Sequence, residues 1–422
     1  MTASGDDTRV LCERVARAAR EASARLRTLP GAERGRLLRE MGASLREAGA
    51  TIVGANAQDM ARAADLTPAL RDRLRLDPAR VEQMARAVEA IADQPDPVGR
   101  VVDGRVLASA IRLEKRRVPI GVVLVVYESR PNVTSDAAAL CLRSANAVVL
   151  RGGSEALASN RAIVRALSAP LERAGLAGAL GFVDSPDRAA IGHLVRLEKV
   201  IDLAIPRGGP GLMRAVTDAA RIPVVKHDAG NCHVYIDAHL DGMLDSAVAI
   251  TVNAKAQRPG VCNAAETLLV HRDIATVFLP RVGAALAERG VELRADDEAR
   301  RLLPAARPAS EKDWSTEYLD LILAVRVVDS LESACEHIRR YGSQHTEAIV
   351  TSSIAAAERF VALVDSASVM VNCSTRFADG GEYGLGAEIG ISTDRLHARG
   401  PMGAEDLTTF QWVLTGTGQV RG

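Results

Sequence analysis

The sequence predicts an α/β protein with parallel β-sheets and more than one domain. The 422 residues exceed what one compact core ordinarily holds. From Ile120 onward, short β-branched runs alternate with helical stretches, which is typical of parallel strands covered by helices. Apolar residues make up 47% and aromatic residues 3% of the chain, so we expect cores of Ala, Val, Leu and Ile.

The composition excludes several classes of protein. Lys and Arg (53) balance Asp and Glu (53), so nothing indicates a nucleic-acid-binding surface. The first twenty residues lack the apolar stretch of a signal peptide, and no apolar run approaches the ~20 residues that span a bilayer. Six scattered cysteines fit a reducing cytoplasm. We therefore expect a cytoplasmic protein without a membrane segment.

The first half of the chain is predicted to be helical and then α/β. Residues 10–92 carry helical apolar spacing, residues 93–104 hold prolines and glycines of a loop, and residues 107–118 predict an exposed antiparallel ribbon. The run IGVVLVVYES predicts a strand buried on both faces. Further strands are predicted at residues 147–150, 181–184 and 201–205, and Ser185 is predicted to open a helix.

The second half repeats the alternation. Strands are predicted at 232–237, 267–271, 321–328, 347–351 and 367–371, with helices at 244–256 and from Ser330 to about Arg340. The glycine-rich stretch 376–403 is predicted to be a functional loop. The tail, 407–420, predicts one or two strands that pair with the ribbon or with another subunit.

Cys262 is the leading candidate for a catalytic nucleophile. It follows Pro259-Gly260 in QRPGVCNAAETLLV, near Arg258 and Lys255. Neighbouring cations lower a thiol pKa, and a thiolate attacks acyl carbons to form a thioester. The alternative is a small buried apolar residue, which position alone favours. The remaining cysteines keep that interpretation: Cys12, Cys141, Cys232, Cys335 and Cys373.

Three loops after predicted strands carry further candidates. Asn132, in YESRPNVTSD, could donate its amide to an oxyanion, although the position by itself favours an Asx turn after proline. The turns RGGSEA (151–156) and PRGGPG (206–211) each join a strand to a helix, where free amides can hold phosphate. No strand is followed by G-x-G-x-x-G, so the usual dinucleotide fingerprint is absent. His227, His233 and His239 straddle a strand without a pattern of acids, and no metal site is predicted.

Several segments, in order along nearly the whole chain, resemble the γ-glutamyl phosphate reductases of the aldehyde dehydrogenase superfamily. The specific ones are YESRPN, RPGVCNA and LHARGPMG. The resemblance implies an aldehyde dehydrogenase-like α/β fold with two parallel α/β domains and a small β-ribbon for oligomerisation. The implied ranges are 1–98 and 118–228 for nucleotide binding, 229–385 for catalysis, and 99–117 with 398–422 for the ribbon and tail.

The resemblance also implies the chemistry. Cys262 matches the family's catalytic cysteine, and Asn132 would hold the oxyanion. The implied reaction is NADPH-dependent reduction of γ-glutamyl phosphate to glutamate 5-semialdehyde through a thioester, the second step of proline biosynthesis. The segment KHDAGNCHV lacks the general-base glutamate of hydrolytic aldehyde dehydrogenases, which suits phosphate rather than water. The alternatives are a cysteine aldehyde dehydrogenase for another semialdehyde and a catalytically silent protein of this fold.

The remaining roles follow from the same resemblance. Glu317, in DWSTEYL, would hold the nicotinamide ribose, with a surface acid as the alternative. Arg151 or Ser154 would meet the adenosine 2′-phosphate, although Ser154 stands where the family often has lysine. A homo-oligomer is implied, and the sequence leaves open a transient contact with glutamate kinase. The cofactor candidates are Arg151, Gly152, Gly153, Ser154, Glu155, Gly208, Gly209 and Glu317, and the candidates for the phosphate or carboxylate of the substrate are Arg258, Lys255 and Arg130.

Overall fold

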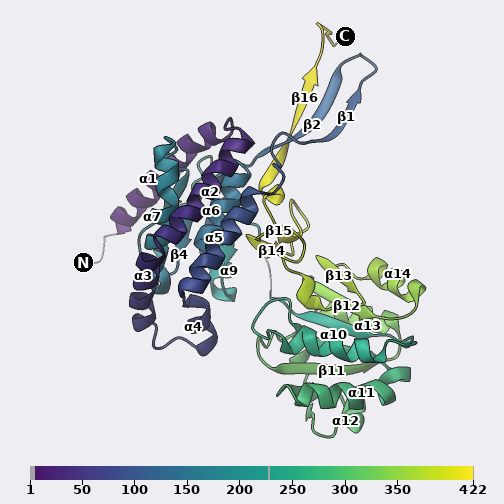
Figure 1. Ribbon diagram of the computed structural model, residues 1–422. Helices are drawn as coiled ribbons and strands as arrows, with labels where there is room; N and C mark the ends of the chain where they lie inside the picture. Colours follow the sequence, from purple (N-terminus) through teal and green to yellow (C-terminus); the bar gives the residue numbers. More distant parts are fainter. Residues whose placement is uncertain (1–4, 227–228, 422) are drawn as a thin grey trace. The chain divides into compact units, whose positions relative to one another are not determined.

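The computed structural model describes residues 5–226 and 229–421, so His227 and Asp228 lie outside the described residues. The described chain divides into two compact units (Figure 1). Unit 1 holds residues 5–226, 384–390 and 402–421, and unit 2 holds residues 229–383 and 391–401. The assignment of nucleotide binding and catalysis to the predicted ranges stays a prediction.

Unit 1 is built on a parallel sheet with the strand order β5-β4-β3-β6. All residues of β3 and β4 are buried, as expected for β-branched strands covered on both faces. The strands are β3 (Val122–Tyr127), β4 (Ala147–Gly152), β5 (Leu180–Phe182) and β6 (Leu203–Arg207).

The helices of unit 1 confirm the predicted helical character of residues 10–92. They are α1 (Gly5–Leu26), α2 (Gly31–Glu47), α3 (Gly49–Arg62), α4 (Pro68–Leu74), α5 (Pro78–Ala92), α6 (Asn132–Arg143), α7 (Leu157–Arg173), α8 (Ala189–Leu194) and α9 (Pro210–Ala219). The predicted helix opening at Ser185 is too early, because α8 begins after Asp187, whose carboxylate accepts from the backbone N–H of Ala189 at 2.9 Å.

An antiparallel sheet of order β1-β2-β16 also belongs to unit 1. Its strands are β1 (Val101–Val106), β2 (Arg112–Pro119) and β16 (Thr408–Thr415). The predicted pairing of the tail with the ribbon is confirmed by the register from Thr408↔Pro119 to Thr415↔Arg112. Figure 1 shows these strands as a long ribbon that extends from the helices of the same unit. The predicted loop 93–104 is wrong at its end, because residues 101–104 already belong to β1.

Unit 2 contains a second parallel sheet, with the order β10-β9-β11-β8-β7-β12-β13. Its main strands match the predicted runs: β7 (Cys232–Ile236), β8 (Ala265–His271), β11 (Ile322–Val328), β12 (Thr346–Val350) and β13 (Ser368–Val371). Helices α10 (Leu244–Ala256), α13 (Leu331–Tyr341) and α14 (Ile354–Leu363) connect them. Ser330 caps α13 as predicted, accepting from the N–H of Ser333.

The sequence interpretation omitted part of unit 2. The omitted elements are α11 (Arg272–Ala287), β9 (Glu292–Ala295), α12 (Asp297–Leu302) and β10 (Arg307–Pro308). The glycine-rich stretch is mostly irregular, with a 3₁₀ turn η3 (Thr375–Phe377) and the short strands β14 (Gly390–Ser392) and β15 (Gly400–Met402). Within the described residues, every helix is too short or too polar to cross a lipid bilayer.

Candidate active site

Cys262 lies in the loop between α10 and β8 and is partly exposed. Its main chain is fixed by Cys232, whose buried thiol donates to the carbonyl oxygen of Cys262 over 3.2 Å. Burial raises the pKa of the Cys232 thiol well above its ordinary value, so this group remains a proton donor. The fold thus keeps Cys232 as a buried thiol that contacts the backbone of Cys262, and Cys262 itself is partly exposed to solvent.

Gly230 comes into close contact with the backbone of the Cys262 loop. A Cβ atom on Gly230 would lie 1.8 Å from the carbonyl oxygen of Cys262, so only glycine fits this position. The N–H of Gly230 donates to Glu317 Oε1 at 2.8 Å. The structure therefore brings Glu317 and Cys262 to the same backbone segment of unit 2. The predicted contact of Glu317 with a ribose stays a prediction.

Lys255 does not lie at a surface. Its side chain is fully buried, and its ammonium nitrogen is 2.5 Å from Glu266 Oε2. Burial lowers the pKa of Lys255 and raises the pKa of Glu266 to about 7, and each charge counters the shift of the other. The expected cation beside the thiol is therefore engaged in an internal ion pair. Arg258, by contrast, is exposed on the loop that leads to Cys262.

Arg376 is a contact of the Cys262 loop that the sequence interpretation missed. Its guanidinium donates to the side-chain oxygens of Gln257, at 2.8 Å, and of Asn263. It also interacts electrostatically with Cys262 and Arg258. Arg376 lies in the segment STRFADGG, over a hundred residues after the cysteine, and no local pattern links the two.

Asn132 is the first residue of α6 in unit 1, directly after the turn that follows β3. Its side chain is exposed, and its amide nitrogen donates to Asp136 Oδ2 at 3.0 Å. Burial raises the pKa of Asp136 to about 6, and the bond from Asn132 and the charge of Arg207 oppose that rise. Arg130, in the same turn, is half-buried.

Arg151 serves the interior of unit 1. It is buried at the end of β4 and donates to the carbonyl oxygens of Pro186 and Asp187 at 3.3 and 3.1 Å. Desolvation lowers its pKa. The guanidinium thus ties β4 to the segment before α8, and the predicted contact of Arg151 with the cofactor stays a prediction. Ser154, in the next turn, is exposed.

Two carboxylates occupy the turns that were predicted to hold a dinucleotide. Glu155 accepts from the backbone N–H and the hydroxyl of Ser129, at 2.6 and 2.8 Å. Glu128 accepts from the N–H of Gly209 at 2.9 Å, at the start of α9. A Cβ on Gly208 would lie 2.3 Å from the Glu128 carboxylate, so this glycine makes room for the acid. Glu128 thus takes the N-terminal amide at which a phosphate was expected.

The remaining turn glycines lie at the end of β4. Gly152 and Gly153 are both buried there. Among the described residues, no group of three or more His, Cys, Asp and Glu side chains is arranged to hold a metal ion.

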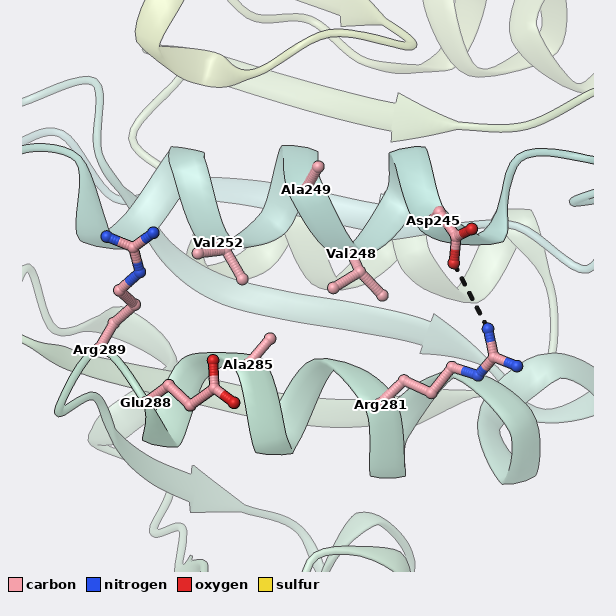
Figure 2. Close-up of a pocket in the computed structure, with 8 residues that line it drawn as sticks. All are labelled: Asp245, Val248, Ala249, Val252, Arg281, Ala285, Glu288 and Arg289. Carbon is pink, nitrogen blue, oxygen red and sulfur yellow. Dashed lines mark hydrogen bonds and ion pairs between the residues drawn. The ribbon is translucent and has the colours of Figure 1, made fainter.

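A surface pocket of about 360 Å³ lies between α10 and α11 (Figure 2). Valine and alanine side chains form its centre, and the ion pair between Asp245 and Arg281, at 3.4 Å, lies at one end. No predicted site residue lines this pocket. Its full lining is Asp245, Val248, Ala249, Val252, Arg281, Ala285, Glu288 and Arg289.

Comparison with known proteins identifies the family. Residues 4–307 match the model of the aldehyde dehydrogenase family. The chain belongs to this family. A γ-glutamyl phosphate reductase of Moorella thermoacetica is 51% identical over 406 residues, which cover 96% of this chain and 97% of the relative. One of Geobacter metallireducens is 49% identical over 410 residues, covering 96% of this chain and 98% of the relative.

A solved structure agrees with these relatives. The crystal structure of a γ-glutamyl phosphate reductase of Thermotoga maritima superimposes on this chain with a TM-score of 0.94, covering 97% of this chain and 100% of that chain. The two sequences are 43% identical. The predicted resemblance and the aldehyde dehydrogenase-like fold are therefore confirmed. Within the family fold, the structure gathers Cys262, Glu317 and Arg376 in unit 2, and Asn132 and the two glycine turns belong to unit 1.

Proposed function

We propose that this aldehyde dehydrogenase family member reduces γ-glutamyl phosphate to glutamate 5-semialdehyde and releases phosphate, the second step of proline biosynthesis from glutamate. The observation that carries the proposal is a partly exposed cysteine, Cys262, in a loop whose backbone is fixed from behind. Identity near 50% to γ-glutamyl phosphate reductases over almost their whole length supports the substrate.

In the proposed reaction, the Cys262 thiolate attacks the acyl carbon of the substrate. The carbon–oxygen bond to phosphate breaks, phosphate leaves with the electron pair, and a thioester remains on Cys262. The Asn132 amide stays the predicted donor to the oxyanion. NADPH, when bound, supplies the hydride that reduces the thioester. Release of the aldehyde returns the sulfur to its thiolate form.

The turns of unit 1 fit a dinucleotide in part. Ser154 is exposed, and Gly209 faces open space where a Cβ would lie, so both turns offer surface to a ligand. Arg151 and Glu128 serve internal contacts. We therefore propose NADPH as the cofactor, with Ser154 and Gly209 as contacts.

The reverse reaction tests the proposal. Purified protein is given glutamate 5-semialdehyde, phosphate and NADP⁺, and the absorbance of NADPH is followed. We expect turnover that requires phosphate and that Cys262→Ala abolishes, while dinucleotide binding by the variant persists. Absence of turnover, or turnover without phosphate, would reject the proposal. Loss of dinucleotide binding in Cys262→Ala would show that the cysteine is structural.

We further propose a cytoplasmic homo-oligomer that assembles through the sheet β1-β2-β16. Apolar side chains along β16 are well exposed: Phe410 by 42%, Trp412 by 50% and Leu414 by 57%. An exposed row of this kind is typical of interaction sites. The acyl phosphate is a labile substrate, so a transient contact with glutamate kinase is part of the proposal. Co-sedimentation of the two purified enzymes would test that contact.

A further inference from the structure

The side chain of Arg376 bridges the two ends of the loop that carries Cys262. Arg376 lies in η3, where its N–H donates to the hydroxyl of Ser374. Its Nε donates to Gln257, the residue that follows α10, and its Nη1 donates to Asn263, the residue after the cysteine. Because a guanidinium is planar and rigid, these bonds fix the distance between the ends of the loop.

Asn263 locks the same loop from the other side. It is buried, and its amide nitrogen donates to the carbonyl oxygen of Ala378 at 2.9 Å. The oxygen of that amide accepts from Arg376, so both polar ends of the Asn263 side chain bind the turn 376–378. A buried amide with both ends satisfied has one favourable orientation. The backbone of Cys262 is therefore coupled to η3.

The charge of Arg376 also acts on the thiol. Burial lowers the pKa of Arg376, Asp379 opposes that effect, and Arg258 adds to it. Cys262 is among the groups that raise the pKa of Arg376. Because an electrostatic interaction is mutual, the positive guanidinium favours the negatively charged sulfur of Cys262.

We propose that Arg376 is a positioning residue for Cys262, which holds the loop in register and favours the ionised sulfur. This inference deepens the proposed function and relies on it for the turnover measurements alone. Arg376 acts through Cys262 and its neighbours. Its role therefore separates into a charge, which lysine preserves, and a fork of hydrogen bonds, which lysine loses.

The experiment measures alkylation of Cys262 by iodoacetamide in the full chain between pH 5 and 9, followed by mass spectrometry of the Cys262 peptide. The chains compared are the wild type, Arg376→Gln, Arg376→Lys and the control Arg339→Gln, whose residue is exposed on α13. We expect Arg376→Gln to react about tenfold more slowly at pH 7, with a profile moved to higher pH by about one unit. Arg339→Gln keeps the wild-type profile.

Arg376→Lys separates the two parts of the role. We expect it to keep the wild-type alkylation profile and to lose about tenfold in kcat, with KM for phosphate within about twofold of the wild type. A folded Arg376→Gln chain that alkylates like the wild type would overturn the inference. If that chain does not fold, wild-type kcat in Arg376→Lys would overturn it. Alkylation needs no substrate, so failure of the proposed reaction in the wild type leaves this test intact.

Discussion

The side-chain amide of Asn132 donates to the carboxylate of Asp136 one turn later in α6, across 3.0 Å. An i, i+4 pair of this kind orients the amide. The amide nitrogen has a second N–H, which can donate to another acceptor. Because burial raises the pKa of Asp136 to about 6, the acceptor changes its protonation state within the range of ordinary assays. Arg207 and Asn132 favour the ionised form, and Glu388 opposes it.

The pH dependence of turnover follows from this pair. Protonation of Asp136 below pH 6 weakens its bond to Asn132, so we expect kcat to fall as the pH drops through about 6. Asp136→Asn removes the titrating group, and its kcat should be nearly constant in the same window. The measurement is kcat from pH 5 to 8 for both chains. An identical acidic limb in the variant would assign the limb to another group.

The same shift predicts an effect on stability. A carboxyl group whose pKa is raised on folding stabilises the folded state at low pH, and this contribution disappears as the pH rises from about 4 to about 6. At pH 7 the desolvated charge of the half-buried Asp136 opposes folding. We therefore expect Asp136→Asn to unfold at a higher urea concentration than the wild type at pH 7, with a smaller difference at pH 4.5. A lower midpoint at pH 7 would contradict this sign.

Removal of the Asn132 amide should lower kcat by a factor of about 10²–10³ if it donates to the oxyanion. Asn132→Ala should leave KM and the melting temperature close to those of the wild type, because the side chain is exposed and its amide donates to a neighbour in the same helix, Asp136. Asn253→Ala, at an exposed position of α10, is the matched control. An unchanged kcat in Asn132→Ala would assign the residue to the turn.

Because Lys255 and Glu266 form a buried ion pair, we expect replacement of Lys255 to lower the free energy of unfolding and to leave the KM for substrate unchanged. Lys255→Met leaves the Glu266 carboxyl buried without its partner, which should cost about 3–5 kcal/mol in the free energy of unfolding at pH 8. The double variant Lys255→Met/Glu266→Gln should recover most of that loss. Urea denaturation of both chains, with the exposed Arg258→Gln as control, gives the values. A change in KM without a change in stability would restore the substrate role of Lys255.

The exposed apolar face of β16 predicts which substitutions dissociate the proposed homo-oligomer. Replacing Trp412 and Leu414 by glutamate puts charge on an apolar strand at the edge of its sheet, so we expect dissociation into smaller species. Sedimentation velocity at several concentrations measures the distribution. Glutamate in place of Thr415, an exposed polar residue at the end of the same strand, is the control. An unchanged distribution in the double variant would place the interface elsewhere.

The parallel sheets could be predicted because their strands carry apolar runs, as in β3 and in the first four residues of β4, all of which are buried. β1 escaped prediction because all its residues are exposed and it contains Asp103 and Gly104, so no alternation marks it. α11 contains Pro280, and β10 spans two residues, so neither carries a strong periodic signal. Sequence periodicity reveals helices and strands that bury one regular face. β1, α11 and β10 lack such a clear periodic pattern.

The site shows the same division. The loop position of Cys262 and the position of Asn132 shortly after a predicted strand followed from local sequence and from family resemblance. The structure places Asn132 at the first residue of α6 and not in a loop. The actual partners of Arg151 and Lys255 could not be predicted, since hydrogen bonds to Pro186 and Glu266 depend on how separate elements meet. The charge of a side chain is visible in a sequence, whereas its burial, which decides whether that charge meets a ligand, is a property of the fold.

The return of the chain to unit 1 constrains how the protein is made. Asn146 donates to the carbonyl of Leu407 at 2.7 Å, and β16 then pairs with β2 along its whole length. On the ribosome, β2 emerges long before its neighbour, and its open edge waits while all of unit 2 is translated. A polypeptide terminated before β16 would therefore present an unpaired edge of β2 to other nascent chains, so β16 (Thr408–Thr415) protects the newly made protein from edge-to-edge association.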